Sequence, residues 1–350
     1  MLIRNATLPD GRTGIDILVQ AGRIAALGPH LFQGQPAPAG SEDIDAINKA
    51  RAPYKAWLKQ GVEYLSTSLV DPSLAAEPMD AATLRRFQVL FQLTREERES
   101  ELRVLAETEQ EATGSMGDDT PLAVMSHFIR PVHDYFRQAF AQVTNPPIDP
   151  LREEVVMSLA TQMGPEGNVF EDTPGNAVQV LLNSPVLSQR KLRQLLKMPQ
   201  YVEKNRLIDL SYSLDEGLKA GIERICAEAE AAAREGIVML LLSDRYPVAD
   251  RPMVHALLAT SAVHHHLSNA GLRCDVNLIL ETGTARDAHH MACLLGFGAT
   301  AVYPYLAYQT LFDLGRRGIL QLSKGGEQSQ IGRRYRKGIY KGLSKIISKM

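Results

Sequence analysis

The sequence predicts an α/β protein in three parts: a short N-terminal β segment, a mainly helical first part, and a βαβ region with a parallel sheet. Continuous apolar runs at 236–242, 274–280 and 299–303 have the length and composition of buried parallel strands. Helical patterns separate these runs, and the order strand–helix–strand requires right-handed crossovers within one sheet. Short runs rich in Ile, Leu and Val, separated by glycines, open the chain.

The opening segment, residues 1–40, holds three strand patterns, at 1–7, 14–19 and 22–28. The next stretch, QPAPAGS at 35–41, has the composition of a linker and marks a seam. A small hairpin without partner strands is marginally stable in water, so we expect this segment to be loosely attached.

Residues 41–140 are predicted to be mainly helical, and residues 141–330 to alternate strand and helix. Thr94 and Glu97 fit the N-cap and the third position of one helix. Another helix is indicated by four apolar residues at helical spacing: Leu84, Phe87, Leu90 and Phe91. Between the strands of the second region, helices are expected at 221–236, 250–271 and 284–296.

Composition excludes several classes of protein. The chain has 350 residues and a formal net charge of −2, which argues against a general nucleic-acid binder. The three cysteines, Cys226, Cys274 and Cys293, lie far apart and predict no disulfide framework, which suits a reducing cytoplasm. No apolar run reaches the length of a membrane span, and charged residues interrupt any signal-peptide core.

Histidines suggest a metal site but favour another interpretation. Residues 264–266 are three histidines in one predicted helix, and His289, His290 and Cys293 lie in the next. Cys293 follows His289 by four residues, a known ligand spacing for zinc. Adjacent helical residues point about 100° apart, so three consecutive histidines cannot face one ion. We therefore expect histidines packed at an interface or half exposed, and no metal ligands.

The segment ETGTARD at 281–287 follows a predicted strand and opens a predicted helix. Ligands of α/β proteins bind at such turns, because the helix N-terminus offers free N–H groups. Gly283 permits close backbone approach, and Arg286 carries a charge that pairs with anions. A tight turn with Thr284 as the helix cap explains the same residues equally well.

Several long and unusual sequence motifs are typical of one family. TNPPIDP at 144–150 is rigid, since each proline fixes its own φ and restricts the residue before it. GSMGDDTP at 114–121, ETGTARDAHH at 281–290 and GRRYRKG at 332–338 add further words in order. Together they closely resemble the central domain of the large subunit of glutamate synthase, over roughly nine tenths of the chain.

The resemblance implies that residues 41–350 form this central domain, with 141–330 similar to a rudimentary, non-binding copy of the FMN barrel that follows it. FMN and an iron–sulfur cluster belong to the parent family, and we expect no cofactor in this chain. Members of the family begin their mature chain with a catalytic Cys, whereas the first Cys here is Cys226. We therefore predict no catalytic, cofactor-binding or metal-binding residues.

Residues 1–40 instead resemble the N-terminal segment of a metal-dependent amidohydrolase of the cytosine deaminase type. Such an enzyme should show a His-x-His pair on the first strand of its barrel. Here the next histidine after His30 is His127, without a second histidine beside it. This resemblance stops near Gly40.

The tail, residues 331–350, carries seven Lys or Arg and no acid. Its lysines recur every four residues opposite an apolar face, as in a membrane-surface or partner-binding helix. Its three glycines weaken a helix by up to ~1 kcal/mol each. By the resemblance it is a basic lead-in to a missing FMN barrel. We expect a frayed terminus with a partly exposed apolar stripe formed by Ile339, Leu343 and Ile346.

The resemblance implies a non-catalytic central domain in glutamate biosynthesis and ammonia assimilation. The domain would link the glutaminase and FMN synthase domains and line part of the ammonia tunnel. Its partners would be the remaining glutamate synthase domains and the small subunit, in the cytoplasm, with electrons from NADPH or ferredoxin. The chain alone is expected to be inactive. A truncated cytosine deaminase-like hydrolase and a stand-alone binding module that uses the basic tail remain the alternatives.

Overall fold

The chain forms two compact units, Met1–Lys59 and Gln60–Met350. This computed structural model describes residues 2–21, 23–31, 42–43, 53–65, 71–112, 125, 130–137, 157–168, 170–248, 250–322 and 328–349. The expected seam at 35–41 and the words at 114–121 and 144–150 lie outside the described residues. The division between the units falls after the expected seam.

The first unit is a four-stranded sheet in the order β3-β2-β1-β4. The three strands expected from the sequence are confirmed, and β4 adds a short parallel partner to β1. Buried Asp16 accepts hydrogen bonds from the backbone N–H of Asn5 at 3.2 Å and of Leu31 at 3.1 Å, which satisfies its carboxylate. The elements of this unit are β1 (Leu2–Ala6), β2 (Ile15–Gln20), β3 (Arg23–Pro29), β4 (Glu42–Asp43) and α2 (Tyr54–Gly61), whose last two residues belong to the second unit.

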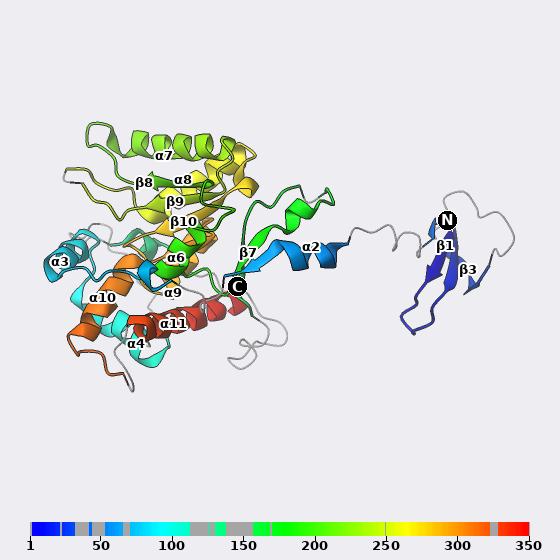
Figure 1. Ribbon diagram of the computed structural model, residues 1–350, viewed down its shortest axis with the longest axis horizontal. Helices are drawn as coiled ribbons and strands as arrows, with labels where there is room; N and C mark the ends of the chain where they lie inside the picture. The colour runs from blue at the N-terminus through cyan, green and yellow to red at the C-terminus, as the bar shows by residue number, and fades with distance from the viewer. Residues whose placement is uncertain are drawn as a thin grey trace. The chain divides into compact units, whose positions relative to one another are not determined.

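The core of the second unit is a parallel sheet in the order β11-β10-β9-β8, with α7 and α8 packed beside it (Figure 1). Every residue of β9 and β10 is buried, which explains their continuous apolar sequences. Strand β8 lies at the edge and is partly exposed, so its sequence lacks the apolar run and was not predicted. The strands are β8 (Asn205–Asp209), β9 (Met239–Ser243), β10 (Asn277–Glu281) and β11 (Ala301–Tyr303); the helices that connect them are α7 (Gly217–Arg234), α8 (Ala256–Asn269) and α9 (Ala288–Gly296), with the 3-10 turn η5 (Arg273–Asp275) before β10.

A smaller sheet in the order β5-β7-β6 was not predicted. It combines a parallel pair, β5 with β7, and an antiparallel pair, β6 with β7. Val186, which follows it, forms a parallel bridge with Val302 and so reaches the edge of the larger sheet. The elements are β5 (Val62–Tyr64), β6 (Thr161–Met163), β7 (Gln179–Leu182), the 3-10 turns η1 (Pro72–Leu74) and η4 (Pro174–Ala177), and helix α6 (Gln189–Leu196).

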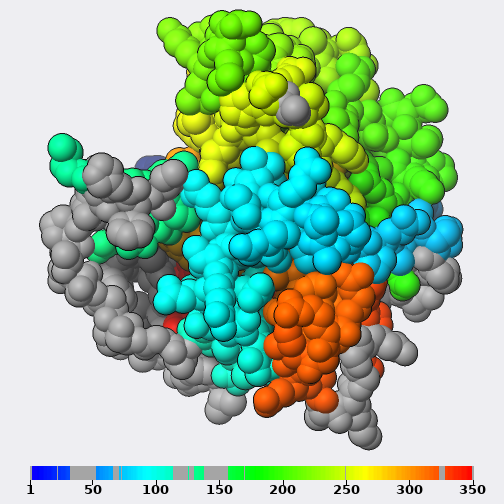
Figure 2. Space-filling view, turned by 90° about the vertical axis from the view of Figure 1, so that its left-hand side faces the viewer, coloured from blue at the N-terminus to red at the C-terminus, as the bar shows by residue number. Residues whose placement is uncertain are grey.

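A helical layer completes the second unit. Figure 2 shows the segment from α3 to α4 (cyan) between the sheet region (green to yellow) and α10 (orange). The predicted capping box is confirmed: the Glu97 N–H donates to Thr94 Oγ1 at 3.1 Å, and the Thr94 N–H donates to Glu97 Oε2 at 2.8 Å. The elements are α3 (Ala81–Leu90), the π-helical η2 (Glu97–Leu102), α4 (Arg103–Thr108), the 3-10 turn η3 (Val132–Tyr135), α10 (Tyr305–Arg316) and α11 (Gln328–Lys349).

The basic tail is a docked helix, and the expectation of a frayed terminus was wrong. Helix α11 packs against α4, α9 and α10 (Figure 1). Ile339 and Leu343, expected on an exposed stripe, are buried together with Ile331 and Tyr335, and only Ile346 is partly exposed. Each of the four fully buried side chains contributes about 1.5–3 kcal/mol, which exceeds the helix-weakening effect of three glycines.

The glycines of α11 are contact positions. A Cβ added at Gly338 would stand 2.8 Å from Leu105 Cδ2, and one at Gly342 would stand 2.5 Å from Ala288 Cβ. Both distances are far inside van der Waals contact, so a side chain at these positions would push α11 away from α4 and α9. The residues that weaken the isolated helix therefore permit its docking.

Two predicted helices begin later than expected. Helix α8 starts at Ala256 because Asp250 has a positive φ of 61° and His255 provides the cap. Helix α9 starts at Ala288, and Asp287, not Thr284, caps it by accepting from the His290 N–H at 2.8 Å. Within the described part of the chain, no helix is long and apolar enough to cross a bilayer.

Candidate functional site

The carboxyl end of the parallel sheet is the place where α/β proteins bind ligands, and here side chains of the chain itself occupy it. Asp244 directly follows β9 and is buried. Its Oδ1 accepts from the Gly283 N–H at 2.9 Å, and its Oδ2 accepts from the Thr282 hydroxyl at 2.5 Å. The Asp244 carboxylate thus takes the donors that the 281–287 turn would offer to an anion. Burial raises the pKa of Asp244 to about 7.

A second acid closes the same edge. Glu281, the last residue of β10, is fully buried. Its Oε1 accepts from Arg193 at 3.0 Å and from Arg245 at 2.8 Å. Its Oε2 accepts from the Ser243 hydroxyl at 2.9 Å. Two guanidinium groups and a hydroxyl therefore satisfy this carboxylate from within the chain.

Arg286, the expected anion-binding residue, is already paired. It is buried, and its guanidinium donates to Glu97 Oε1 and to the carbonyl oxygen of Phe91. The Tyr335 hydroxyl of α11 donates to the Arg286 carbonyl at 2.6 Å. A Cβ at Gly283 would stand 2.8 Å from the Phe91 ring, so Gly283 serves packing against this segment. Arg286 therefore holds η2 on the turn, and it does not face a ligand.

The three consecutive histidines of α8 contact three different groups, as their helical spacing predicts. His264 Nδ1 accepts from Arg273 at 3.1 Å, His265 Nδ1 lies 2.8 Å from the Ser261 carbonyl oxygen, and His266 Nε2 lies 2.6 Å from Glu230 Oε2. All three cysteines of the chain are free. Among the described residues, no group of three or more His, Cys, Asp or Glu has a geometry that holds a metal ion.

A buried imidazole cluster joins residues far apart in the sequence. The ring of His133, on η3, lies 4.9 Å from that of His255 and 4.4 Å from that of His290, measured between centroids. Neither ring nitrogen of His133 has a hydrogen-bond partner within the described part of the chain, and the same holds for His290 Nδ1. Sequence reasoning missed this cluster, because no spacing along the chain relates residue 133 to residues 255 and 290.

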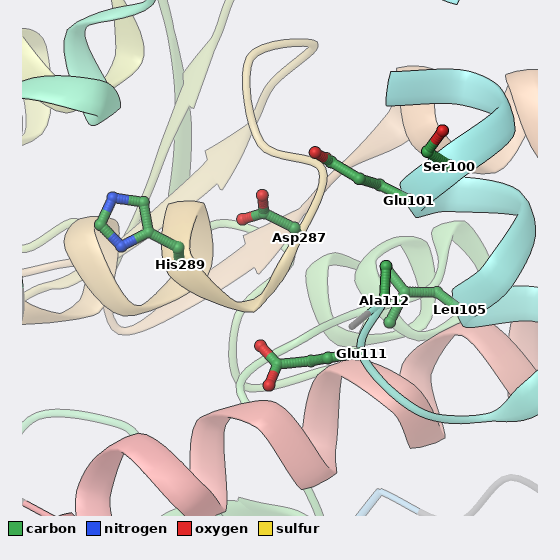
Figure 3. Close-up of a pocket in the computed structure, with 7 residues that line it drawn as sticks. All are labelled: Ser100, Glu101, Leu105, Glu111, Ala112, Asp287 and His289. Atoms are coloured by element: carbon green, nitrogen blue, oxygen red, sulfur yellow. The ribbon is translucent and has the colours of Figure 1, made fainter. Parts of the chain in front are cut away.

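A cavity of about 300 Å³ lies beside the first turn of α9 (Figure 3). Glu101 comes from η2 and Asp287 from the α9 cap, and the Glu101 side chain extends toward the turn that carries Asp287. His289 comes from α9, and Glu111 lies in the segment after α4. The full lining is Ser100, Glu101, Leu105, Glu111, Ala112, Asp287 and His289.

The cavity wall combines three acids and one imidazole, and the pKa of each is raised above its ordinary value. Burial raises the pKa of Glu101 to about 7, and it also raises the pKa values of Glu111 and Asp287. The pKa of His289 is raised to about 9, chiefly by its contact with Cys293, whose Sγ lies 3.7 Å from His289 Nε2. The same Nε2 lies 2.9 Å from the His133 carbonyl oxygen. No nucleophile with an adjacent base and a set of oxyanion donors is assembled among these lining residues.

Comparison with known proteins supplies the decisive observation. The family model described as the glutamate synthase central domain matches residues 86–350. The chain belongs to this family.

Glutamate synthases of plants, bacteria and yeast resemble the chain along most of its length. It is 39% identical over 312 residues to ferredoxin-dependent glutamate synthase 2, chloroplastic, of Arabidopsis thaliana, covering 85% of the chain and 19% of that protein. It is 40% identical over 307 residues to the glutamate synthase [NADPH] large chain of Azospirillum brasilense, covering 85% of the chain and 20% of that protein. For glutamate synthase [NADH] of Saccharomyces cerevisiae, the values are 38% over 298 residues, 82% and 14%. The chain spans a fifth or less of these relatives.

Proposed function

We propose that this chain acts as the non-catalytic central domain of a glutamate synthase. It would link the glutaminase and FMN synthase domains and form part of the wall of the ammonia tunnel between them. Its partners are then those domains, and the small subunit where one is present, and its place of action is the cytoplasm. FMN and the iron–sulfur cluster would be held by the partner domains.

The observation that carries the proposal is the closed carboxyl edge of the parallel sheet. In a catalytic α/β protein this edge presents unpaired donors to a ligand. Here Asp244 occupies the turn after β10, Glu281 pairs with Arg193 and Arg245, and Arg286 pairs with Glu97. A sheet with its ligand-binding edge filled in this way suits a spacer that keeps a fold without its chemistry.

The first test is activity of the purified full chain. We expect no glutamine-dependent glutamate formation above a blank without enzyme, and no cytosine deamination with added zinc or iron. Glutamate formation by this polypeptide alone would contradict the non-catalytic role. Metal-dependent cytosine deamination would instead support the amidohydrolase alternative.

The linking role requires a second test in a complete enzyme. The matching segment of the Azospirillum brasilense large chain is replaced by residues 86–350 of this chain. We expect the chimera to form glutamate from glutamine without releasing free ammonia. The control is the parent's own segment, reinserted through the same junctions. A chimera that hydrolyses glutamine but releases the ammonia to solution would argue against a contribution to the tunnel wall.

A further inference from the structure

The buried imidazoles around His133 attach a short segment to the rest of the second unit. Residues 130–137 contain η3, and His133 is completely buried between His255 at the start of α8 and His290 on α9. Two further contacts hold the segment: the His133 carbonyl oxygen lies 2.9 Å from His289 Nε2, and the rings of Phe136 and Phe297 lie 4.9 Å apart.

The cluster holds its imidazoles in the uncharged form. His255 Nδ1 accepts from the Leu257 N–H at 3.2 Å, so the ring carries its proton on Nε2. Burial lowers the pKa of His255 to about 4 and that of His290 to about 3, and it lowers the pKa of His133 still further. Both ring nitrogens of His133 lack a hydrogen-bond partner among the described residues, so an added proton on that ring has no acceptor there.

The charged groups around the cluster reinforce this preference. Arg286, from the turn before α9, and His289, whose pKa is raised to about 9, are the neighbouring cations. The neighbouring acids are Asp287 of α9, whose Oδ1 lies 3.4 Å from His290 Nδ1, Asp134 of η3, paired with Arg130, and Glu97 and Glu101 of η2.

These acids do not stabilise added protons on the three imidazoles as the pH falls. Glu97 already pairs with Arg286. Burial raises the pKa of Glu101 to about 7 and also raises the pKa values of Asp134 and Asp287, so these groups bind protons more readily than ordinary carboxyl groups as the pH falls. A proton added to any of the three neutral rings therefore meets two cations and weakened anions.

We propose that the packed imidazoles of His133, His255 and His290 form an acid-released latch, which holds residues 130–137 on helices α8 and α9 at neutral pH. Acid favours the opened state, in which the rings are hydrated and bind protons. Opening separates the His133 carbonyl from His289, a residue of the cavity wall. A change in pH that opens the latch therefore removes a contact of this wall residue.

The sign and size of the effect follow from linkage. A histidine whose folded-state pKa is depressed contributes stability above the ordinary pKa, and this stability is lost as the pH falls below about 6.5. Between pH 7.5 and pH 5, each imidazole that regains its ordinary pKa on opening raises the opening constant by about 30-fold.

Hydrogen exchange of the full chain tests the latch, with rates corrected for the intrinsic effect of pH. In the wild type we expect the opening constant of amides 130–137 to rise by about 30-fold or more from pH 7.5 to pH 5. Amides of β10 should keep their protection over the same range. A pH-independent opening constant, or loss of protection in β10 together with 130–137, overturns the latch.

Two variants identify the groups responsible. His133→Phe keeps a ring in the cluster but removes one titrating group. The rise in its opening constant between pH 7.5 and pH 5 should therefore be smaller by about 30-fold. His255→Asn keeps an acceptor for the Leu257 N–H and also removes one titrating ring, so it serves if His133→Phe does not fold. The matched control is His266→Gln, on α8 but outside the cluster, which should behave as the wild type. An undiminished rise in both cluster variants would rule the latch out.

Discussion

The carboxyl edge of the sheet and the imidazole cluster are two buried polar regions, joined by the segment 281–290, and they are satisfied in opposite ways. At the edge, each carboxylate oxygen of Asp244 and Glu281 accepts a hydrogen bond from the chain. In the cluster, both nitrogens of His133 are unpartnered among the described residues. Hydrogen bonds from the chain therefore hold the acids of the edge in place, whereas the cluster has an unpartnered imidazole whose protonation favours opening.

The largest expected effect comes from removing an acid of the carboxyl edge. Glu281→Leu leaves Arg193 and Arg245 without their shared partner. Breaking a buried pair costs about 3–5 kcal/mol, and we expect the lower end because both arginines retain contact with water. Urea unfolding followed by helical circular dichroism measures the loss.

The matched control for this change is Glu235→Leu. Glu235 forms an exposed pair with Arg206 at 2.7 Å, and exposed pairs contribute about 0–1 kcal/mol. Equal losses for the two variants would show that the carboxyl edge is no more strongly held than the surface.

The next effect concerns α11, which fastens the segment that joins the two regions. Gly342→Ala would place a Cβ 2.5 Å from that of Ala288, and overpacking of this kind destabilises by about 1–3 kcal/mol. Gly296→Ala, at the end of α9, meets nothing within 4 Å and should be neutral or stabilising by up to ~1 kcal/mol. Thermal unfolding of the two variants, compared with the wild type, decides whether α11 is docked in solution.

The last effect, on the order of 1 kcal/mol for each pH unit, is a difference in pH dependence. The pKa of Asp244 is raised to about 7, so its proton stabilises the fold at low pH, and this contribution is lost as the pH rises from about 4 to about 7. Asp244→Asn mimics the protonated acid and should match the wild type near pH 4. As the pH rises from there, the free energy of unfolding of the variant should increase relative to that of the wild type by on the order of 1 kcal/mol per pH unit.

Unfolding free energies between pH 4 and pH 8 measure this slope, and His133→Phe provides the comparison. Removing a histidine whose folded-state pKa is depressed should raise the free energy of unfolding at acid pH, whereas Asp244→Asn should raise it at neutral pH. Parallel pH profiles for the two variants would erase the distinction between the two regions.

The sequence by itself determined the family, the three N-terminal strands, the central parallel strands and the Thr94–Glu97 capping box. These features are local: an apolar run, a spacing of three residues or a rare sequence word carries each of them. The sequence also indicated that residues 264–266 cannot share one ligand, since that argument needs only helix geometry.

Only the tertiary structure decided what those elements contact. Arg286 had the chemistry of an anion-binding residue, and its pairing with Glu97 depends on where η2 packs. The glycines of α11 have low helix propensity and so predicted a frayed end. Four apolar side chains of this helix are nevertheless buried, because Leu105 and Ala288 lie opposite Gly338 and Gly342 and allow close packing. The meeting of His133 with His255 and His290 had no sequence signal, since packing between distant segments, and not periodicity, brings those rings together.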